Sequence, residues 1–88
     1  MPRFYFDVRD DARFTADEEG MEFPDLDGAE CEAAETATSI GRDLLPRRRA
    51  RNVTVEVRNA HGQRVLTVTV TMQVKRVAPP AVMPFPRA

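Results

Sequence analysis

Hydrophobic and polar residues alternate at the start of the chain. Phe4, Phe6 and Val8 occupy every second position of residues 3–9. A period of two is typical of a β-strand with one buried face. After a short Asp-rich turn, residues 13–16 predict a second, shorter strand. The first part of the chain is therefore expected to form a hairpin.

The hydrophobic period changes to three and four between residues 25 and 45, which predicts a helix. Asp25 is a good N-cap and Pro46 ends the helix. Asp27 with Glu30 could instead form a capping box and start the helix two residues later. The apolar stripe consists of Leu26, Ala29, Ala33, Ala37, Ile40 and Leu44. Because half of the stripe is alanine, the helix can approach a sheet closely.

Strict alternation returns in the last part of the chain and predicts a second hairpin. Its strands are residues 52–59 and 64–77, joined by a turn that contains Gly62. Counting back from the turn places Val53 opposite Val70. The second strand is then longer than its partner.

The overhanging end of this strand, residues 71–77, needs partners for its backbone N–H and C=O groups, or water. Two alternatives stay open at this point. The N-terminal strand of the same chain could pair with it, or another chain could add a strand to it.

These elements predict an α+β fold of β-β-α-β-β order. Two hairpins form a four-stranded, mainly antiparallel sheet, and one helix packs on one face. Residues 21–23 are expected to be extended. The predicted core is Phe4, Phe6, Val8, Phe14, Phe23, Leu26, Ala33, Ala37, Ile40, Leu44, Val55, Leu66, Val68 and Val70. The opposite face, with Tyr5, Thr67, Thr69 and Thr71, is expected to be polar and open.

Length and composition fit one small globular domain. The chain has 88 residues, of which 42% are hydrophobic and 31% charged. We assign residues 1–77 to the domain and residues 78–88, with four prolines, to a flexible tail. No apolar run has the ~20 residues of a membrane span. We therefore expect a cytoplasmic protein without a membrane partner.

The net charge of −1 conceals an uneven distribution. Residues 1–43 carry a net charge of −9, and residues 44–88 carry +8. Such a division can indicate a nucleic-acid or protein partner. It can also be satisfied internally, with the acidic helix near basic strands, and we favour this explanation.

The residue types that carry catalysis or bind metals are sparse. Cys31 and His61 are the only cysteine and histidine, which excludes a disulfide within the chain and a Cys/His zinc site. His61 falls in a predicted turn without a partner nucleophile, and the acidic residues 17–22 lack calcium-loop spacing. We predict no catalytic residue, no cofactor and no metal site.

Basic residues gather directly after the helix and form the best functional candidate. They are Arg47, Arg48, Arg49 and Arg51. Four arginines in five residues can neutralise phosphates. Cations are also favourable at a helix C-terminus for structural reasons alone.

Several segments together resemble an uncharacterised family of short bacterial proteins from rhizobia, methylobacteria and related alphaproteobacteria. They are the opening M-P-R-F-Y-F-D-V-R-D, D-E-E-G-M-E-F-P-D-L at residues 17–26, an Ala/Glu-rich helix, V-E-V-R-N-A-H-G at 55–62, and V-L-T-V at 65–68. The resemblance implies the fold class and no function. F-P-D-L-D-G at 23–28 is more weakly similar to HicB-like antitoxin domains.

We therefore predict a small non-catalytic interaction or regulatory module, with homodimerisation through the overhanging strand as one form. The alternative is a nucleic-acid-associated protein that uses the arginines of residues 47–51. The partner is expected to be a protein, either a second copy or another chain, with nucleic acid as the alternative.

Overall fold

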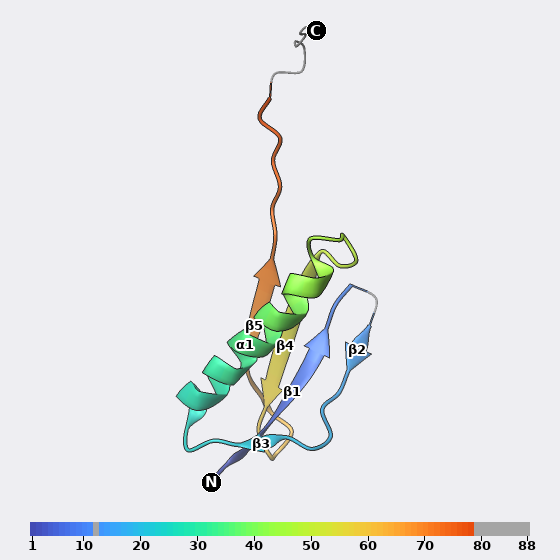
Figure 1. Cartoon of the computed structure of the whole chain (residues 1–88). Helices are drawn as coiled ribbons and strands as arrows, with labels where there is room; N and C mark the ends of the chain where they lie inside the picture. The colour runs from blue at the N-terminus through green and yellow to red at the C-terminus, as the bar shows by residue number, and fades with distance from the viewer. Residues whose placement is uncertain (12, 79–88) are drawn as a thin grey trace, which may run out of the picture.

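The computed structural model describes residues 1–11 and 13–78. One helix lies across a twisted antiparallel sheet, so the predicted α+β class is confirmed (Figure 1). The elements in chain order are β1 (Arg3–Arg9), β2 (Phe14–Thr15), β3 (Met21–Glu22), α1 (Leu26–Leu44), β4 (Asn52–Arg58) and β5 (Arg64–Thr71).

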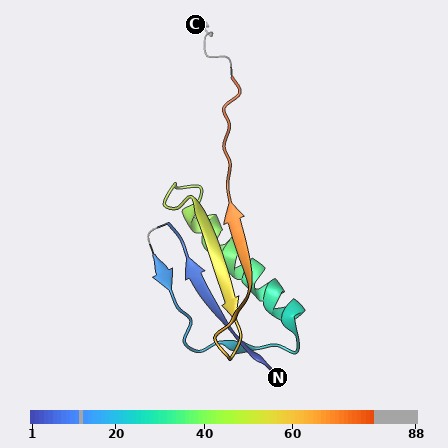
Figure 2. The same cartoon turned by 180° about the vertical axis from the view of Figure 1, so that it is seen from behind.

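The strands follow the order β2-β1-β4-β5, and β3 pairs with the opposite end of β1 from β2. All pairings are antiparallel. Val53 lies opposite Val70, as the sequence predicts. β1 and β4 are central, whereas β5 is an edge strand. Figure 2, seen from behind, shows that the sheet face opposite α1 carries no helix.

The helix begins at its predicted cap. The Asp25 side chain accepts a hydrogen bond of 3.0 Å from the backbone N–H of Gly28. The alternative start at Asp27 is therefore wrong. At the other end the Leu45 N–H donates to the Gly41 carbonyl, and the loop that contains Pro46 follows.

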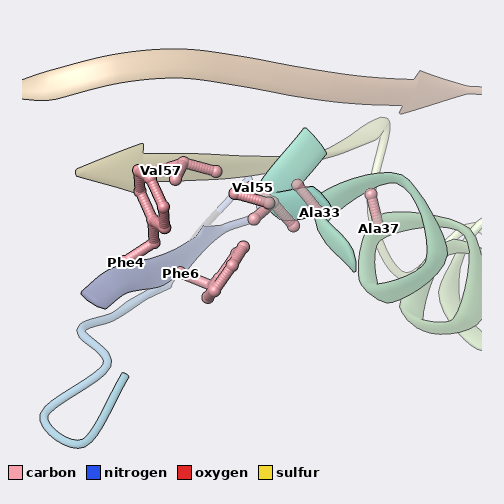
Figure 3. Packing of buried hydrophobic residues seen from close by; sticks show 7 residues of the cluster. Phe4, Phe6, Ala33, Ala37, Val55 and Val57 are labelled. Atoms are coloured by element: carbon pink, nitrogen blue, oxygen red, sulfur yellow. The ribbon is translucent and has the colours of Figure 1, made fainter. Parts of the chain in front are cut away.

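The main core lies between α1 and the central strands. Phe4 and Phe6 of β1 pack with Val55 and Val57 of β4 beneath three helix alanines, as Figure 3 shows for Ala33 and Ala37. Ala29, Ala33 and Ala37 are completely buried. Their small side chains let the helix backbone approach the sheet.

A second cluster closes the core at the C-terminal end of the helix. It consists of Leu45, Ala50 and Val53, with Val8, Ile40, Leu44 and Val70 against it. The sequence stripe included neither Leu45 nor Ala50, because both lie beyond the periodic part of the helix. They become buried only because the loop turns back over β4.

The core prediction is wrong for two residues, Phe14 and Leu26, which are exposed. Phe14 is 48% exposed because β2 pairs it with Arg9, which belongs to the face away from α1. Leu26 is 42% exposed, because Phe23 fills that end of the core. The Phe23 ring packs against the rings of Phe4 and Phe6, with centroid distances of 6.4 and 5.9 Å.

The last strand is shorter than predicted. β5 ends at Thr71, opposite Asn52 at the start of β4, instead of continuing to residue 77. Residues 72–78 run on from β5 away from the sheet in both views (Figures 1 and 2). The N-terminal strand pairs with β4 and not with this extension. Of the predicted tail, residues 79–88 lie outside the described residues.

Candidate functional site at the arginine loop and the edge of β5

The arginine loop, residues 46–51, is held by backbone hydrogen bonds at both ends. The N–H groups of Arg48 and Arg49 donate to the carbonyls of Leu45 and Leu44, at 3.1 and 3.0 Å. The Arg51 N–H donates to Asp11 Oδ2 at 2.8 Å. The loop is therefore fixed to the helix and to Asp11, which follows β1 in the chain.

Arg48 has a φ of 58°, a left-handed conformation that is uncommon for a residue with a side chain. Such conformations persist where the surrounding structure imposes them, and they are concentrated at functional sites. In this loop the conformation places an arginine at the wall of a groove.

All four predicted arginines are exposed. Among the described residues, none of their guanidinium groups forms an ion pair, in contrast to Arg3, Arg9, Arg58 and Arg64. Their charges are thus available to an external partner.

A groove of about 410 Å³ joins this loop to the extension of β5. It is lined by Leu45, Arg48, Ala50, Arg51, Met72 and Val74. The two surface features that the sequence indicates separately therefore meet at one place. Arg49 lies elsewhere, in a hollow of about 360 Å³ with Asp10, Arg13 and Leu44. Arg47 lines neither cavity.

A smaller apolar slot of about 230 Å³ lies beside it, between the C-terminal part of α1 and the end of β5. It is lined by Thr38, Gly41, Arg42, Leu45, Pro46, Val70, Thr71 and Met72. A side chain at Gly41 would come within 3.2 Å of Leu45 and 3.3 Å of Val70. Glycine at this position thus lets the helix and the edge strand meet closely.

Apolar side chains at the mouth of this site are exposed. Met72 is 44% exposed and Val74 is 65% exposed. Both are even-numbered and continue the alternation of Leu66, Val68 and Val70, whose side chains face α1. Beyond the end of the helix, nothing in the described chain covers this apolar row.

The open face of the sheet carries a second polar cluster that the sequence did not single out. Asp7 is buried, with 5% of its surface exposed, and Arg58 donates to its two oxygens at 2.8 and 3.3 Å. Asp7 lies opposite Glu56, and Glu56 binds Arg9 and Arg64. Because like charges on directly opposite residues are destabilising, these arginines are required structurally.

Asp17 connects this cluster to the edge of β1. Its Oδ2 accepts from the Phe6 N–H at 3.1 Å, in the gap between the β2 and β3 pairings, and its Oδ1 accepts from Glu19 and Gly20. Burial alone would raise the pKa of Asp17. The three N–H donors and the positive charge of Arg58 outweigh burial, so this pKa lies below its usual value.

These contacts explain part of the charge division along the sequence. Asp7 of the first half pairs with Arg58 of the second, whereas the Glu56–Arg9 pair joins the two halves with the charges reversed. The pairing is made within the sheet, however, and no ion pair involves a helix carboxylate in the described part of the chain. The sequence predicts that the acidic helix balances basic strands, but the ion pairs of the described residues lie within the sheet.

The other sequence candidates do not assemble. His61 and Cys31 are both exposed and line none of the three cavities described above. No group of three or more His, Cys, Asp or Glu residues within residues 1–11 and 13–78 has a metal-binding arrangement. Across the same residues, no helix has the length and apolarity needed to cross a membrane.

Comparison with known proteins identifies a family without an activity. A family model described as a domain of unknown function, DUF6894, matches residues 3–71. The match ends where β5 ends, so the extension lies beyond it. Neither the curated proteins nor the solved structures contain a significant match.

Proposed function

The chain belongs to the DUF6894 family, and we propose that it is a non-catalytic module that binds a polypeptide strand along β5 and its extension. The observation that carries this proposal is the state of β5. It is an edge strand whose apolar row continues, uncovered, through Met72 and Val74.

An unpaired strand edge is a template for strand addition, in which backbone hydrogen bonds supply affinity and side-chain pockets supply specificity. Proteins commonly protect such edges with charges, prolines or bulges. The bulge between β4 and β5 lies at the turn end of β5, whereas at the other end Val70 and Met72 border an apolar slot. This supports a surface that is kept open for a partner.

Two features support a role without catalysis. His61 and Cys31 have no side-chain hydrogen bond or ion pair with any described residue, and catalysis by either would require a positioned partner. The groove that contains Arg48 and Arg51 holds no carboxylate, thiol or imidazole among its lining residues. The exposed thiol suits the reducing cytoplasm that we propose as the setting.

A capture experiment with paired variants tests the proposal. Met72→Arg should abolish binding of the partner strand, whether that strand comes from a second copy or from another protein in an extract of native cells. Met21→Arg is the matched control, because Met21 is 47% exposed and lies on β3, away from β5. A wild-type chain that is monomeric and captures nothing sensitive to Met72→Arg would overturn the proposed function.

The second candidate function is nucleic-acid binding, favoured by the four exposed and unpaired arginines of the loop. It predicts binding to labelled single- or double-stranded oligonucleotides that weakens steeply as salt increases. Changing Arg47, Arg48, Arg49 and Arg51 to alanine should abolish the binding. An absence of binding at low salt would exclude this candidate.

The similarity of residues 23–28 to HicB-like antitoxins adds no weight to either candidate. Phe23 packs in the core and Asp25 caps α1, so both have structural roles that any fold with this turn would need. The alphaproteobacterial distribution of related chains stays a prediction.

A further inference from the structure

We infer that the strand accepted by β5 is β5 of a second copy of this chain, paired antiparallel with Met72 opposite Met72. This inference rests on the proposed function and adds to it the identity of the partner and the register. It would join the two sheets into one continuous sheet through the two β5 edges.

The length and the pattern of the extension favour a second copy. Residues 72–77 leave the sheet without a partner in the described chain, next to an edge that also lacks one. A symmetric antiparallel pair gives the extension and the β5 edge a partner at the same time, because each extension lies along residues 67–72 of the other copy. One interface thereby provides partners for the unpaired backbone groups of both chains.

Symmetry restricts the register. Residues directly opposite each other in an antiparallel pair project to the same face of the sheet. In a pair related by a twofold axis perpendicular to the sheet, each residue is therefore opposite one an even number of positions away. The apolar row of even-numbered residues stays on the helix side in both copies.

The apolar slot selects the register within this set. With Met72 on the axis, Val74 of the second copy lies opposite Val70, at the slot lined by Thr38, Gly41 and Val70. A shift of the axis to residue 73 would place Arg76 opposite Val70 and bring a charge to the slot. A shift to residue 71 would move Val74 down to Val68 and leave only Met72 at the slot.

Charge complementarity is consistent with this register. Arg76 of the second copy lies opposite Val68, two residues before Val70 along β5. On α1, Glu35 lies three residues before Thr38 on the same side of the helix. Glu35 is exposed and forms no ion pair within the described residues. Basic residues of each extension thereby run beside the acidic helix of the other copy.

Cysteine cross-linking tests the register directly. In a Cys31→Ser chain, Met72→Cys places a thiol on the axis opposite itself, at a Cα separation of about 4.5–5.5 Å that suits a disulfide. We expect most of this variant to form a covalent dimer under mild oxidation. Thr71→Cys and Gln73→Cys are matched controls, because each would face the other position and not itself, and should stay at background. Cross-linking of either control in place of Met72→Cys would overturn the register.

A second measurement does not depend on a new cysteine. Light scattering of the Cys31→Ser chain at micromolar concentration and 150 mM salt, which screens the arginine charges, should give the mass of a dimer. Val74→Arg should weaken the dimer at least tenfold. Val65→Arg is the control, since Val65 is exposed on the same strand but lies at the bulge next to the turn, outside the residues 67–72 that the proposed dimer pairs.

The two proposals fail in different ways. A monomeric chain that still captures another protein in a manner sensitive to Met72→Arg overturns the second copy and retains the strand-binding function. A monomeric chain without such capture overturns both.

Discussion

At the scale of single residues, the ion pairs of the buried carboxylates and the proposed binding surface lie on opposite faces of the sheet. The buried charges Asp7 and Glu56 lie on the face without a helix and are neutralised by three arginines. Asp17 completes this cluster by accepting from three backbone N–H groups. The arginines of the loop lack such partners. The arginines of the sheet therefore have a structural role, whereas those of the loop keep their charges free of ion pairs within the described residues.

The lowered pKa of Asp17 predicts a specific acid response. A carboxyl whose pKa is lower in the folded state contributes stability above its unfolded pKa of about 3.8, and this stability is lost as the pH falls through the folded pKa. Asp17→Asn should cost about 1–2 kcal/mol at pH 7, since it removes a charged acceptor. Urea unfolding should show this difference shrinking below about pH 4. Asp43→Asn, on the exposed side of α1, should show no such loss, and a pH-independent difference for Asp17→Asn would contradict the explanation.

Because the buried Asp7 forms an ion pair with Arg58, the effect of substituting one on the free energy of unfolding should depend on the other. Arg58→Leu leaves the buried Asp7 carboxylate without its counter-charge and should lower the free energy of unfolding strongly. Asp7→Asn in the same chain should recover part of that loss. A double-mutant cycle in urea measures this coupling, and additive single effects would contradict it.

At the scale of elements, the contact between α1 and the sheet depends on small residues. Ala29, Ala33, Ala37 and Gly41 lie four residues apart and form the buried side of the helix. Large side chains from β1 and β4 fill the layer between the helix and the sheet. The helix can therefore lie close to the edge strand, and the slot forms where the helix ends before the apolar row of β5 does.

Enlarging one alanine tests this packing. Ala37→Leu should destabilise the domain by about 1–3 kcal/mol, because the site is completely buried and has no room for three more carbons. Ala34→Leu is the matched control on the exposed side of α1 and should be close to neutral. Thermal unfolding compares the two, and equal effects would show that the close approach of the helix is not limiting.

At the scale of the whole molecule, folding and association should be separable. The sheet and the core are complete by Thr71, whereas the proposed dimer requires the extension that follows. The family match also ends at residue 71. The proposed association therefore depends on one edge, which the folded domain does not need for its own core.

A truncated chain that ends at Thr71 tests this separation. It should unfold cooperatively at a urea midpoint that does not change with protein concentration. The midpoint of the full chain should rise with concentration, because dimer formation stabilises the folded state by mass action. If both midpoints were independent of concentration, the extension would have no role in self-association.

The sequence by itself determined the elements whose hydrophobic period is long and regular. The helix, the β4–β5 hairpin and the Val53–Val70 register follow from local pattern and turn chemistry, whereas the structure decided that Asp25 and not Asp27 is the cap. The arginine cluster was also visible as a run of charge. Shorter elements carry less information, and two residues of β2 cannot show which way Phe14 points.

Only the tertiary structure decided which distant residues meet. The strand order places Asp7 beside Glu56 and Arg58, residues about fifty positions later. The return of the chain after α1 buries Leu45 and Ala50 and brings Arg48 and Arg51 to the groove beside Met72 and Val74. The physical reason is that a period describes neighbours within one element, whereas a site depends on how elements pack. The overhang of the last strand was visible in the pattern, but the pairing of β1 with β4 decided that nothing in the described chain would cover it.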